Sequence, residues 1–400
     1  MKAKGQAIDE RKVLDGNGAA AYGVMLCKPT VVAAYPITPM TPLIERLARF
    51  VADGQLKAET VEVEGEHSAL SVLIGASNAG GRTFTATSSQ GLAFMAEAYI
   101  KAAMDRIPIV MVIVGRELAG PDGVFSGQQD SLTLRDAGWV QIYAESCQEI
   151  LDSIIMAYRL AEDEEILLPV NVCYDGYYLS HLIDGVEVPA QRDVDRFLAP
   201  LSKMNRFRLD PEVGLTYAGL APPEIFTEYR YTHLAALDRA KKKIDAIDLE
   251  FQQLFGRGYG GQIEEYRMED AEIALISMGS PSGTAKAVID SKRDAGMKVG
   301  LVRVRALRPF PKERLAKVLQ GQKAVGVLDK NVCFGWDCGI VLMETKAALH
   351  EAGVMMPAIG FIGGLGNCDI TKQHINRAIE EIDKASRGQT HKPVTWLNLE

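Results

Sequence analysis

The chain has 400 residues, of which 47% are apolar and 24% charged, with a formal net charge of −8. These values are typical of a soluble protein of two or three domains, and the negative charge argues against a nucleic-acid-binding surface. The longest strongly apolar run, 107–114, is shorter than the roughly 20 residues of a membrane-spanning helix. Because 1–5 also lacks the apolar core of a signal peptide, a cytoplasmic location without a membrane partner is expected.

The first half of the chain alternates apolar runs of strand length with amphipathic stretches of helix length. The predicted strands are Val31–Tyr35, Glu59–Val63, Thr83–Thr87, Ile109–Val114, Val140–Ala144 and Pro169–Tyr174. The predicted helices are Pro42–Ala52, His67–Ala79, Gln90–Met104 and Gln148–Asp163. Such alternation is typical of βαβ units, so a parallel sheet covered by helices is expected.

The pattern weakens between 185 and 265 and then resumes. Val186–Ser202 is predicted as a polar connector, His233–Phe255 as one long helix and Gly256–Gly261 as a linker. The second unit has predicted strands Ala271–Met278, Val299–Val304, Ala324–Asp329 and Ala358–Ile362. Its predicted helices are Thr284–Ala295, Glu313–Leu319, Gly339–Glu351 and Thr371–Lys384. A second, smaller α/β domain is therefore expected.

A stiff turn follows the first predicted strand, in the segment Ala34–Pro39. Pro36 and Pro39 fix φ and bias the residues before them towards extended conformations. The turn therefore holds Thr38 in one orientation at the carboxyl end of a parallel strand, where open α/β sheets bind ligands. Thr41 as a helix N-cap, followed by Pro42, accounts for the end of this segment but not for the whole of it.

Two further strand-to-helix turns carry polar side chains. Glu66 falls in the first turn of a predicted helix, where a carboxylate is stabilised by the helix dipole. From the residues alone, that role is simpler than catalysis. The turn after Thr83–Thr87 offers the hydroxyls of Ser88 and Ser89 to an anion or a polar ring, although helix capping explains them equally simply.

Arg116 follows the most apolar strand and suits bidentate capture of a carboxylate, or else it pairs with the neighbouring Glu117. The glycine-rich segment Gly120–Gly127 then forms either a mobile lid or a plain surface loop. The six cysteines lack the close spacing of an iron–sulfur site, so reduced structural cysteines are expected even for the closest pair, Cys333 and Cys338.

Taken together, these turns resemble the α subunit of the thiamine-diphosphate-dependent 2-oxoacid:ferredoxin oxidoreductases. The resemblance spans nearly the whole chain in one order. It is carried by Ala34–Pro39, Val63–Ala69, Arg82–Leu92, Thr133–Trp139, Cys173–Gly176, Arg305–Pro311 and Gly363–Gly366. It implies a pyrimidine-facing thiamine-diphosphate domain with a C-terminal connector over residues 1–262, and a transketolase C-terminal-like domain over 263–400.

The resemblance also implies how the site works. Glu66 would hydrogen-bond the pyrimidine ring and favour the tautomer that takes the thiazolium C2 proton, which gives the ylide. Pro36, Ile37, Ser89 and Gln90 would contact the cofactor, and Thr38 and Arg116 the substrate. A partner β subunit would carry the diphosphate and Mg²⁺, a ferredoxin-like subunit the [4Fe-4S] clusters, and ferredoxin would accept the electrons.

One departure from the family pattern concerns the substrate. Where pyruvate-oxidising members have an apolar segment after the arginine, this chain has glycines, Asp122 and Phe125. This segment resembles that of oxalate oxidoreductase, which implies cleavage of oxalate to two CO₂ without coenzyme A. Because Asp122 would repel oxalate, we hypothesise that the loop swings, with Phe125 near bound substrate and Asp122 near the later intermediate.

Three alternatives remain open at this point. The first is pyruvate or another 2-oxoacid as the substrate, converted with coenzyme A to an acyl-CoA and CO₂. The second is a non-catalytic subunit that shields a partner's cofactor. The third, a dinucleotide-dependent dehydrogenase, is disfavoured because no Gly-x-Gly-x-x-Gly follows the first strand.

Overall fold

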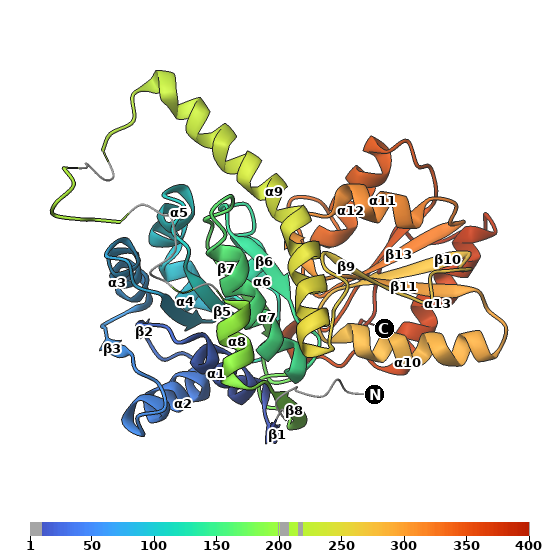
Figure 1. The fold of residues 1–400 in the computed structure, drawn as a ribbon. Helices are drawn as coiled ribbons and strands as arrows, with labels where there is room; N and C mark the ends of the chain where they lie inside the picture. Colours follow the sequence, from blue (N-terminus) through green and yellow to red (C-terminus); the bar gives the residue numbers. More distant parts are fainter. Residues whose placement is uncertain (1–9, 199, 201–207, 215–218, 400) are drawn as a thin grey trace.

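The fold was analysed in a computed structural model that describes residues 10–198, 200, 208–214 and 219–399. Two helix-covered sheets lie side by side, one from each half of the chain, and a long helix runs beside their junction (Figure 1). The N-terminal stretch 1–5 and the last part of the predicted connector, 201–202, lie outside the described residues.

The larger sheet has seven strands in the order β12-β6-β7-β5-β4-β2-β3. Its strands are β2 (Val31–Ala34), β3 (Glu59–Glu62), β4 (Thr83–Thr87), β5 (Val110–Gly115), β6 (Val140–Tyr143), β7 (Val170–Asp175) and β12 (Ala306–Arg308). Only β12 runs antiparallel to its neighbour. The six strands predicted for the first half are thus confirmed to within one residue, whereas β12, added from the second half, was not predicted.

Helices cover both faces of this sheet, whose central strand β5 is apolar on both sides. In β5, Val110, Val112 and Val114 face one core, while Met111 and Ile113 face the other. The covering helices are α1 (Gly16–Cys27), α2 (Thr41–Ala52), α3 (Glu66–Asn78), α4 (Ser89–Phe94), α5 (Ala96–Met104), α6 (Gln129–Thr133) and α7 (Cys147–Ala161).

The helix α1 was not predicted, because it is buried on almost every side and so lacks an amphipathic pattern. It packs closely on α7: a Cβ added at Gly23 would lie 2.9 Å from the carbonyl oxygen of Leu151. The predicted cap of α2 is also wrong, since Met40 occupies the N-cap position and no side chain caps the helix there.

The predicted polar connector over 186–202 is wrong for most of its length. It contains the end of strand β8 (Asp184–Val188), which pairs antiparallel with β1 (Glu10–Leu14), and helix α8 (Gln191–Phe197). Buried Val186 and Val188 alternate with exposed neighbours, so this short strand buries one face only. Alternation over so few residues, with Asp184 and Glu187 among them, was too short to be recognised in the sequence.

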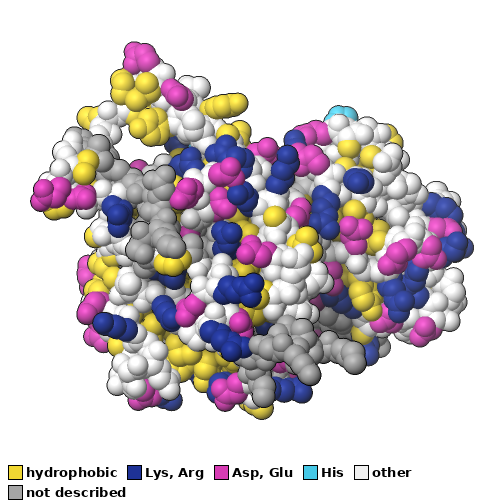
Figure 2. Space-filling model, viewed as in Figure 1, with side chains coloured by type: hydrophobic (Ala, Val, Ile, Leu, Met, Phe, Trp, Pro, Cys, Tyr) yellow, Lys and Arg dark blue, Asp and Glu magenta, His cyan; other side chains and the backbone are white. Residues whose placement is uncertain are grey.

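The long helix α9 spans Pro223–Phe255, beginning ten residues before its predicted start at His233. The described residues from 223 to 232 are all exposed, and burial begins at His233. The helix therefore projects from the body at its N-terminal end (Figure 1). Apolar side chains, including those of Ile225, Phe226 and Tyr229, gather at this projecting end, whereas charges of both signs intermingle over the rest of the face in view (Figure 2).

The smaller sheet has six strands in the order β15-β14-β13-β10-β11-β9. Its strands are β9 (Ile263–Tyr266), β10 (Ile273–Ser277), β11 (Val299–Val304), β13 (Ala324–Asp329), β14 (Ala358–Ile362) and β15 (Val394–Trp396). Its helices are α10 (Pro281–Asp294), α11 (Lys312–Leu319), α12 (Ile340–Glu351), the 3₁₀ turn η2 (Leu365–Asn367) and α13 (Lys372–Ser386). The four predicted strands are confirmed, while the edge strands β9 and β15 were missed.

The two sheets share one of the hydrophobic cores. This core joins Ile113 and Trp139 of the first half to Ile276, Val302 and Val327 of the second. The second sheet begins at Ile263, but the division of the chain into domains at 262/263 stays a prediction. Among the described residues, no helix combines the length and the apolar character needed to cross a membrane.

Candidate functional site

Glu66 lies buried at the carboxyl edge of the larger sheet. It is the first residue of α3, after Gly65 in the N-cap position, and only 6% of it is exposed. Burial raises the pKa of its carboxyl group, and its own backbone N–H lowers it in part. A buried acid with a raised pKa is the form that proton transfer near neutral pH requires.

The turn after β4 packs against Glu66 and supplies further polar atoms. Thr87 Oγ1 and Ser88 Oγ are buried and have no hydrogen-bond partner among the described residues. Ser88 is the N-cap residue of α4, but its side chain makes no capping hydrogen bond. The simpler account of this turn, capping by Ser88, is therefore wrong, and unpaired buried hydroxyls of this kind suit a polar ligand.

Gly91 explains how the acid and the hydroxyls come so close. A Cβ at this position would collide with Glu66 Oε1 and Thr87 Oγ1. Only a glycine leaves room for the carboxyl group to lie over the first turn of α4.

The proline turn and Arg116 meet on the same edge. One Arg116 terminal nitrogen donates to the carbonyl oxygen of Thr38 (3.0 Å), and its Nε donates to that of Gly123 (2.7 Å). Glu117 is not its partner in the described residues. Thr38 and Pro36 are exposed, while Ile37 is half-buried and packs on the core. The structure thus brings Thr38 and Arg116 together, and their contact with the substrate stays a prediction.

A buried acid that the sequence did not reveal, Asp130, links these pieces. Its carboxylate accepts the backbone N–H groups of Ser89 (2.9 Å), Arg116 (3.0 Å) and Ser131 (2.7 Å). Burial raises the pKa of Asp130 to about 6, although these three N–H groups lower it in part. Ser89 adopts a left-handed conformation (φ 48°) and its hydroxyl contacts the side chain of Gln90, so Asp130 holds an unfavourable turn in place.

The segment from Arg116 to Ser126 is a hairpin-like loop closed by a bridge between those two residues. Asp122 is exposed at its tip, and Phe125 is 49% exposed, with its ring 5.3 Å from that of Tyr177. The structure therefore places Phe125 against the β7 turn and Asp122 towards solvent. The proposed swing of this loop stays a prediction.

The second half of the chain holds the base of this loop. The N–H of Asn367 donates to Ser126 O (3.0 Å), and buried Lys330 Nζ donates to Ser126 Oγ (2.6 Å) and Asp175 Oδ1 (3.0 Å). Burial raises the pKa of Glu117, beneath Gly127, to about 7. The glycine motif Gly363–Gly366 thus lies beside the loop 116–126.

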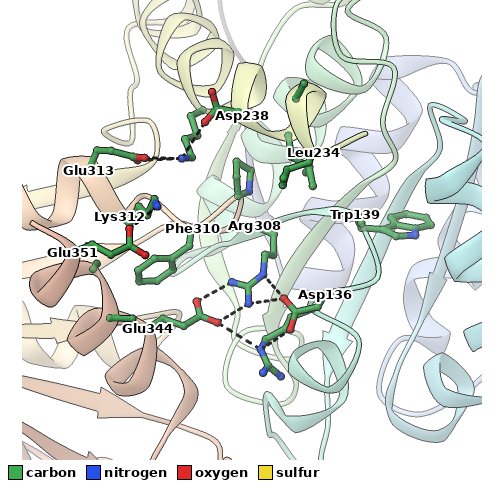
Figure 3. A pocket seen from close by; sticks show the side chains of 18 of the residues that line it. Asp136, Trp139, Leu234, Asp238, Arg308, Phe310, Lys312, Glu313, Glu344 and Glu351 are labelled. Atoms are coloured by element: carbon green, nitrogen blue, oxygen red, sulfur yellow. Dashed lines mark hydrogen bonds and ion pairs between the residues drawn. The ribbon is translucent and has the colours of Figure 1, made fainter. Parts of the chain in front are cut away.

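A cleft of about 770 Å³ lies elsewhere, between α9, Arg308–Phe310 and α12 (Figure 3). Its central cation, Arg308, pairs with Glu344 and with Asp136 (2.9 Å), and Arg135 reaches the same two acids. Because these charges neutralise one another, the cleft is better explained as a joint between the halves of the chain than as a ligand site.

Comparison with known protein families gives two matches. Residues 22–248 match the family described as pyruvate flavodoxin/ferredoxin oxidoreductase, thiamine diphosphate-binding. Residues 271–375 match the family described as pyruvate:ferredoxin oxidoreductase core domain II.

Several relatives match this chain over nearly their whole length, and their names refer to different 2-oxoacids. The PorA subunit of pyruvate synthase from Methanothermobacter thermautotrophicus is 46% identical, over 97% of this chain and 98% of that protein. The α subunit of NADH-dependent phenylglyoxylate dehydrogenase from Aromatoleum evansii is 42% identical, over 98% and 96%. The VorA subunit of ketoisovalerate oxidoreductase from Pyrococcus horikoshii is also 42% identical, over 97% and 98%.

Two solved structures share the fold. The 2-oxoglutarate:ferredoxin oxidoreductase of Magnetococcus marinus matches with a TM-score of 0.69 at 22% identity, over 94% of this chain and 66% of that chain. A split-gene transketolase, an inactive β4 tetramer, matches with a TM-score of 0.52 at 12% identity, over 92% and 98%. At these identities the likeness shows the fold alone.

Proposed function

Because this chain belongs to the α subunits of the thiamine-diphosphate-dependent 2-oxoacid:ferredoxin oxidoreductases, we propose that it forms the pyrimidine-facing wall of an active site shared with a partner subunit. The observation that carries this proposal is buried Glu66 beside the unpaired hydroxyls of Thr87 and Ser88. Tyr35 and Phe94, 40% and 62% exposed, flank this wall and suit contact with a partner.

These residues fit a thiamine ring system. When bound, thiamine diphosphate supplies the carbon nucleophile and electron sink that loss of CO₂ from a 2-oxoacid requires. Glu66 holds a proton at a ring nitrogen, and the hydroxyls of the Thr87–Ser89 turn give the ring polar partners. Pro36 and Ile37 form the rigid side of the wall. Mg²⁺ and [4Fe-4S] clusters belong to partner chains, from which ferredoxin takes the electrons.

We propose a 2-oxoacid with one carboxylate, such as pyruvate, as the substrate, with coenzyme A accepting the acyl group. The loop 116–126 brings one cation, Arg116, and two acids, Glu117 and Asp122, which suits a single carboxylate and opposes a dianion. The relatives named above act on 2-oxoacids, so the alternative stated from the sequence is better supported than oxalate.

A substrate panel tests this choice. The chain, produced with its partner subunits, would be assayed with pyruvate, 2-oxoisovalerate, phenylglyoxylate and oxalate, each with and without coenzyme A, using a dye as the electron acceptor. We expect turnover of a 2-oxoacid that depends on coenzyme A. Turnover of oxalate without coenzyme A would instead establish the first hypothesis.

Replacing Arg116 with glutamine is expected to reduce kcat/KM for the 2-oxoacid by roughly 10- to 100-fold, because hydrogen bonds to charged groups contribute about 1.5–3 kcal/mol. Most of the change should appear in KM, since the guanidinium binds a carboxylate that persists until CO₂ leaves. The matched control is Arg387→Gln at the end of α13, an exposed arginine that pairs with Asp383 of its own helix, which should leave 2-oxoacid turnover nearly unchanged. Equal effects of the two variants would contradict the assignment.

Substituting alanine for Gly91 is expected to abolish activity while the subunit still folds, because the new methyl group would displace the Glu66 carboxyl group. Measured affinity for thiamine diphosphate should fall in the same variant. Gly75→Ala on α3 is the control, since a Cβ there meets nothing within 4 Å. Normal cofactor affinity in the Gly91 variant would show that the placement of the Glu66 carboxyl group does not depend on a glycine at position 91.

A further inference from the structure

Cys333 and Cys338 face each other across a tight turn that follows β13. They are paired as an isolated antiparallel bridge, in which the Cys333 N–H donates to the Cys338 carbonyl oxygen (2.8 Å). The Trp336 N–H closes the turn on the Cys333 carbonyl oxygen (2.9 Å). Sequence spacing alone shows two cysteines with four residues between them, whereas the structure shows that they are direct cross-strand partners.

This pairing has the geometry that a disulfide needs. Directly opposed residues of an antiparallel ladder have Cα atoms about 4.5 or 5.5 Å apart, depending on whether they exchange hydrogen bonds, and disulfides join Cα atoms roughly 4.4–6.8 Å apart. Directly opposed side chains also lie on the same face of the ladder. A bond between the two sulfur atoms therefore needs little movement of the backbone.

The turn is open to a small reagent from one side. Phe334 and Trp336 are 87% and 65% exposed, and Cys333 is half-buried, whereas only 4% of Cys338 is exposed. Burial also raises the pKa of the Cys338 thiol, so it is the weaker nucleophile in the resting state. Because of these differences, a reagent reacts first with Cys333. Cys338 then attacks the mixed disulfide formed on Cys333.

We propose that Cys333 and Cys338 form a reversible intramolecular disulfide by exchange with a low-molecular-weight disulfide of the glutathione type. The Cys333 thiolate attacks one sulfur of the small disulfide, and the first small thiol leaves with a proton. The Cys338 thiolate then attacks the sulfur of Cys333, and the second small thiol leaves. The two cysteines lose two electrons and two protons, which the small disulfide gains as it becomes two thiols.

The turn 333–338 is connected to the loop 116–126 through the residues just before Cys333. The Val332 N–H donates to Gln129 Oε1 (3.0 Å), and Lys330 holds Ser126 and Asp175. On the other side, Gly339 after Cys338 is the N-cap of α12. Closing the turn would therefore fix a segment that supports the base of loop 116–126. This places a redox-sensitive modification next to the site without using any of its proposed catalytic residues.

The test uses the assembled enzyme, kept anaerobic and incubated with graded mixtures of oxidised and reduced glutathione. After acid quenching, alkylation with N-ethylmaleimide and tryptic digestion, both cysteines lie in one peptide, Asn331–Lys346, that contains no other cysteine. We expect loss of the doubly alkylated peptide and its replacement by a disulfide form that carries no maleimide and is two hydrogens lighter than the reduced, unalkylated peptide. Reduction with dithiothreitol should restore two maleimides.

Cys368 provides an internal control because it is exposed and has no cysteine partner, so it should gain glutathione under the same conditions. In Cys333→Ser, which changes the half-buried member of the pair, Cys338 should remain alkylated. The proposal fails if wild-type Asn331–Lys346 keeps two maleimides at ratios that modify Cys368. It also fails if Cys333 carries glutathione while Cys338 is still alkylated.

Discussion

Replacing Glu66 with glutamine is expected to lower turnover of the 2-oxoacid by roughly 10²–10⁴-fold, the usual contribution of a positioned acid or base. Glutamine keeps the shape of the side chain but cannot exchange a proton with a ring nitrogen. Steady-state assay of the assembled enzyme measures the loss. Retained turnover would favour the alternative in which this chain only shields a partner's cofactor.

The same substitution should raise the stability of the subunit at neutral pH. Burial raises the folded-state pKa of Glu66 above its ordinary value of 4.5. A group with a raised folded-state pKa contributes its full stabilisation of the folded state below pH 4.5. This stabilisation is lost as the pH rises through the folded-state pKa. Thermal unfolding of Glu66→Gln should therefore occur at a higher temperature than that of wild type at pH 7, and the difference should vanish in acid.

Glu64→Gln is the matched control for both measurements. Glu64 lies two residues away and is exposed, and a hydrogen bond from Ser68 lowers its pKa. Its substitution should leave turnover intact and should not stabilise the subunit. If only Glu66→Gln changes turnover and stability, these changes come from the place of Glu66 in the site and not from the removal of a negative charge in general.

The sequence predicted the parts of this fold whose pattern is local. Strands such as Ile109–Val114 are apolar on both faces and are followed by a glycine, so their bounds are readable without partners. It missed α1 and β12, whose stability comes from burial against elements distant in the chain. Intrinsic propensity does not encode such contacts.

The candidate site shows the same division. Thr38 and Arg116 were predicted because each follows an apolar strand, where a parallel sheet places its ligands, whereas Glu66 was predicted as a catalyst only through the family resemblance. Asp130 was missed because it lies in a short polar stretch and acts only through the backbone N–H groups of distant turns. Lys330 was missed for a related reason, since its partners Ser126 and Asp175 come from the other half of the chain.

Replacing Glu149 with alanine is expected to destabilise the chain by about 3–5 kcal/mol, the usual cost of breaking a buried ion pair from one side. Glu149 on α7 is fully buried and accepts hydrogen bonds from Arg303 (2.8 Å), near the end of β11, and from Arg305 (2.7 Å), between β11 and β12. Its loss would leave two buried guanidiniums without their shared carboxylate, at the junction of the halves. Denaturant titration measures the change.

The pH dependence of the free energy of unfolding shows whether the Glu149 carboxylate causes this loss of stability. Burial alone would raise the pKa of Glu149, but the guanidiniums of Arg303 and Arg305 hold it below 4.5. A depressed folded-state pKa gives stability that is present above 4.5 and is lost as the pH falls through the folded-state value. The difference in the free energy of unfolding between wild type and Glu149→Ala should therefore become smaller in acid. Glu351→Ala, which breaks the exposed pair with Lys312, should cost far less than Glu149→Ala, so an equal loss in the two variants would show that Glu149 does not join the halves.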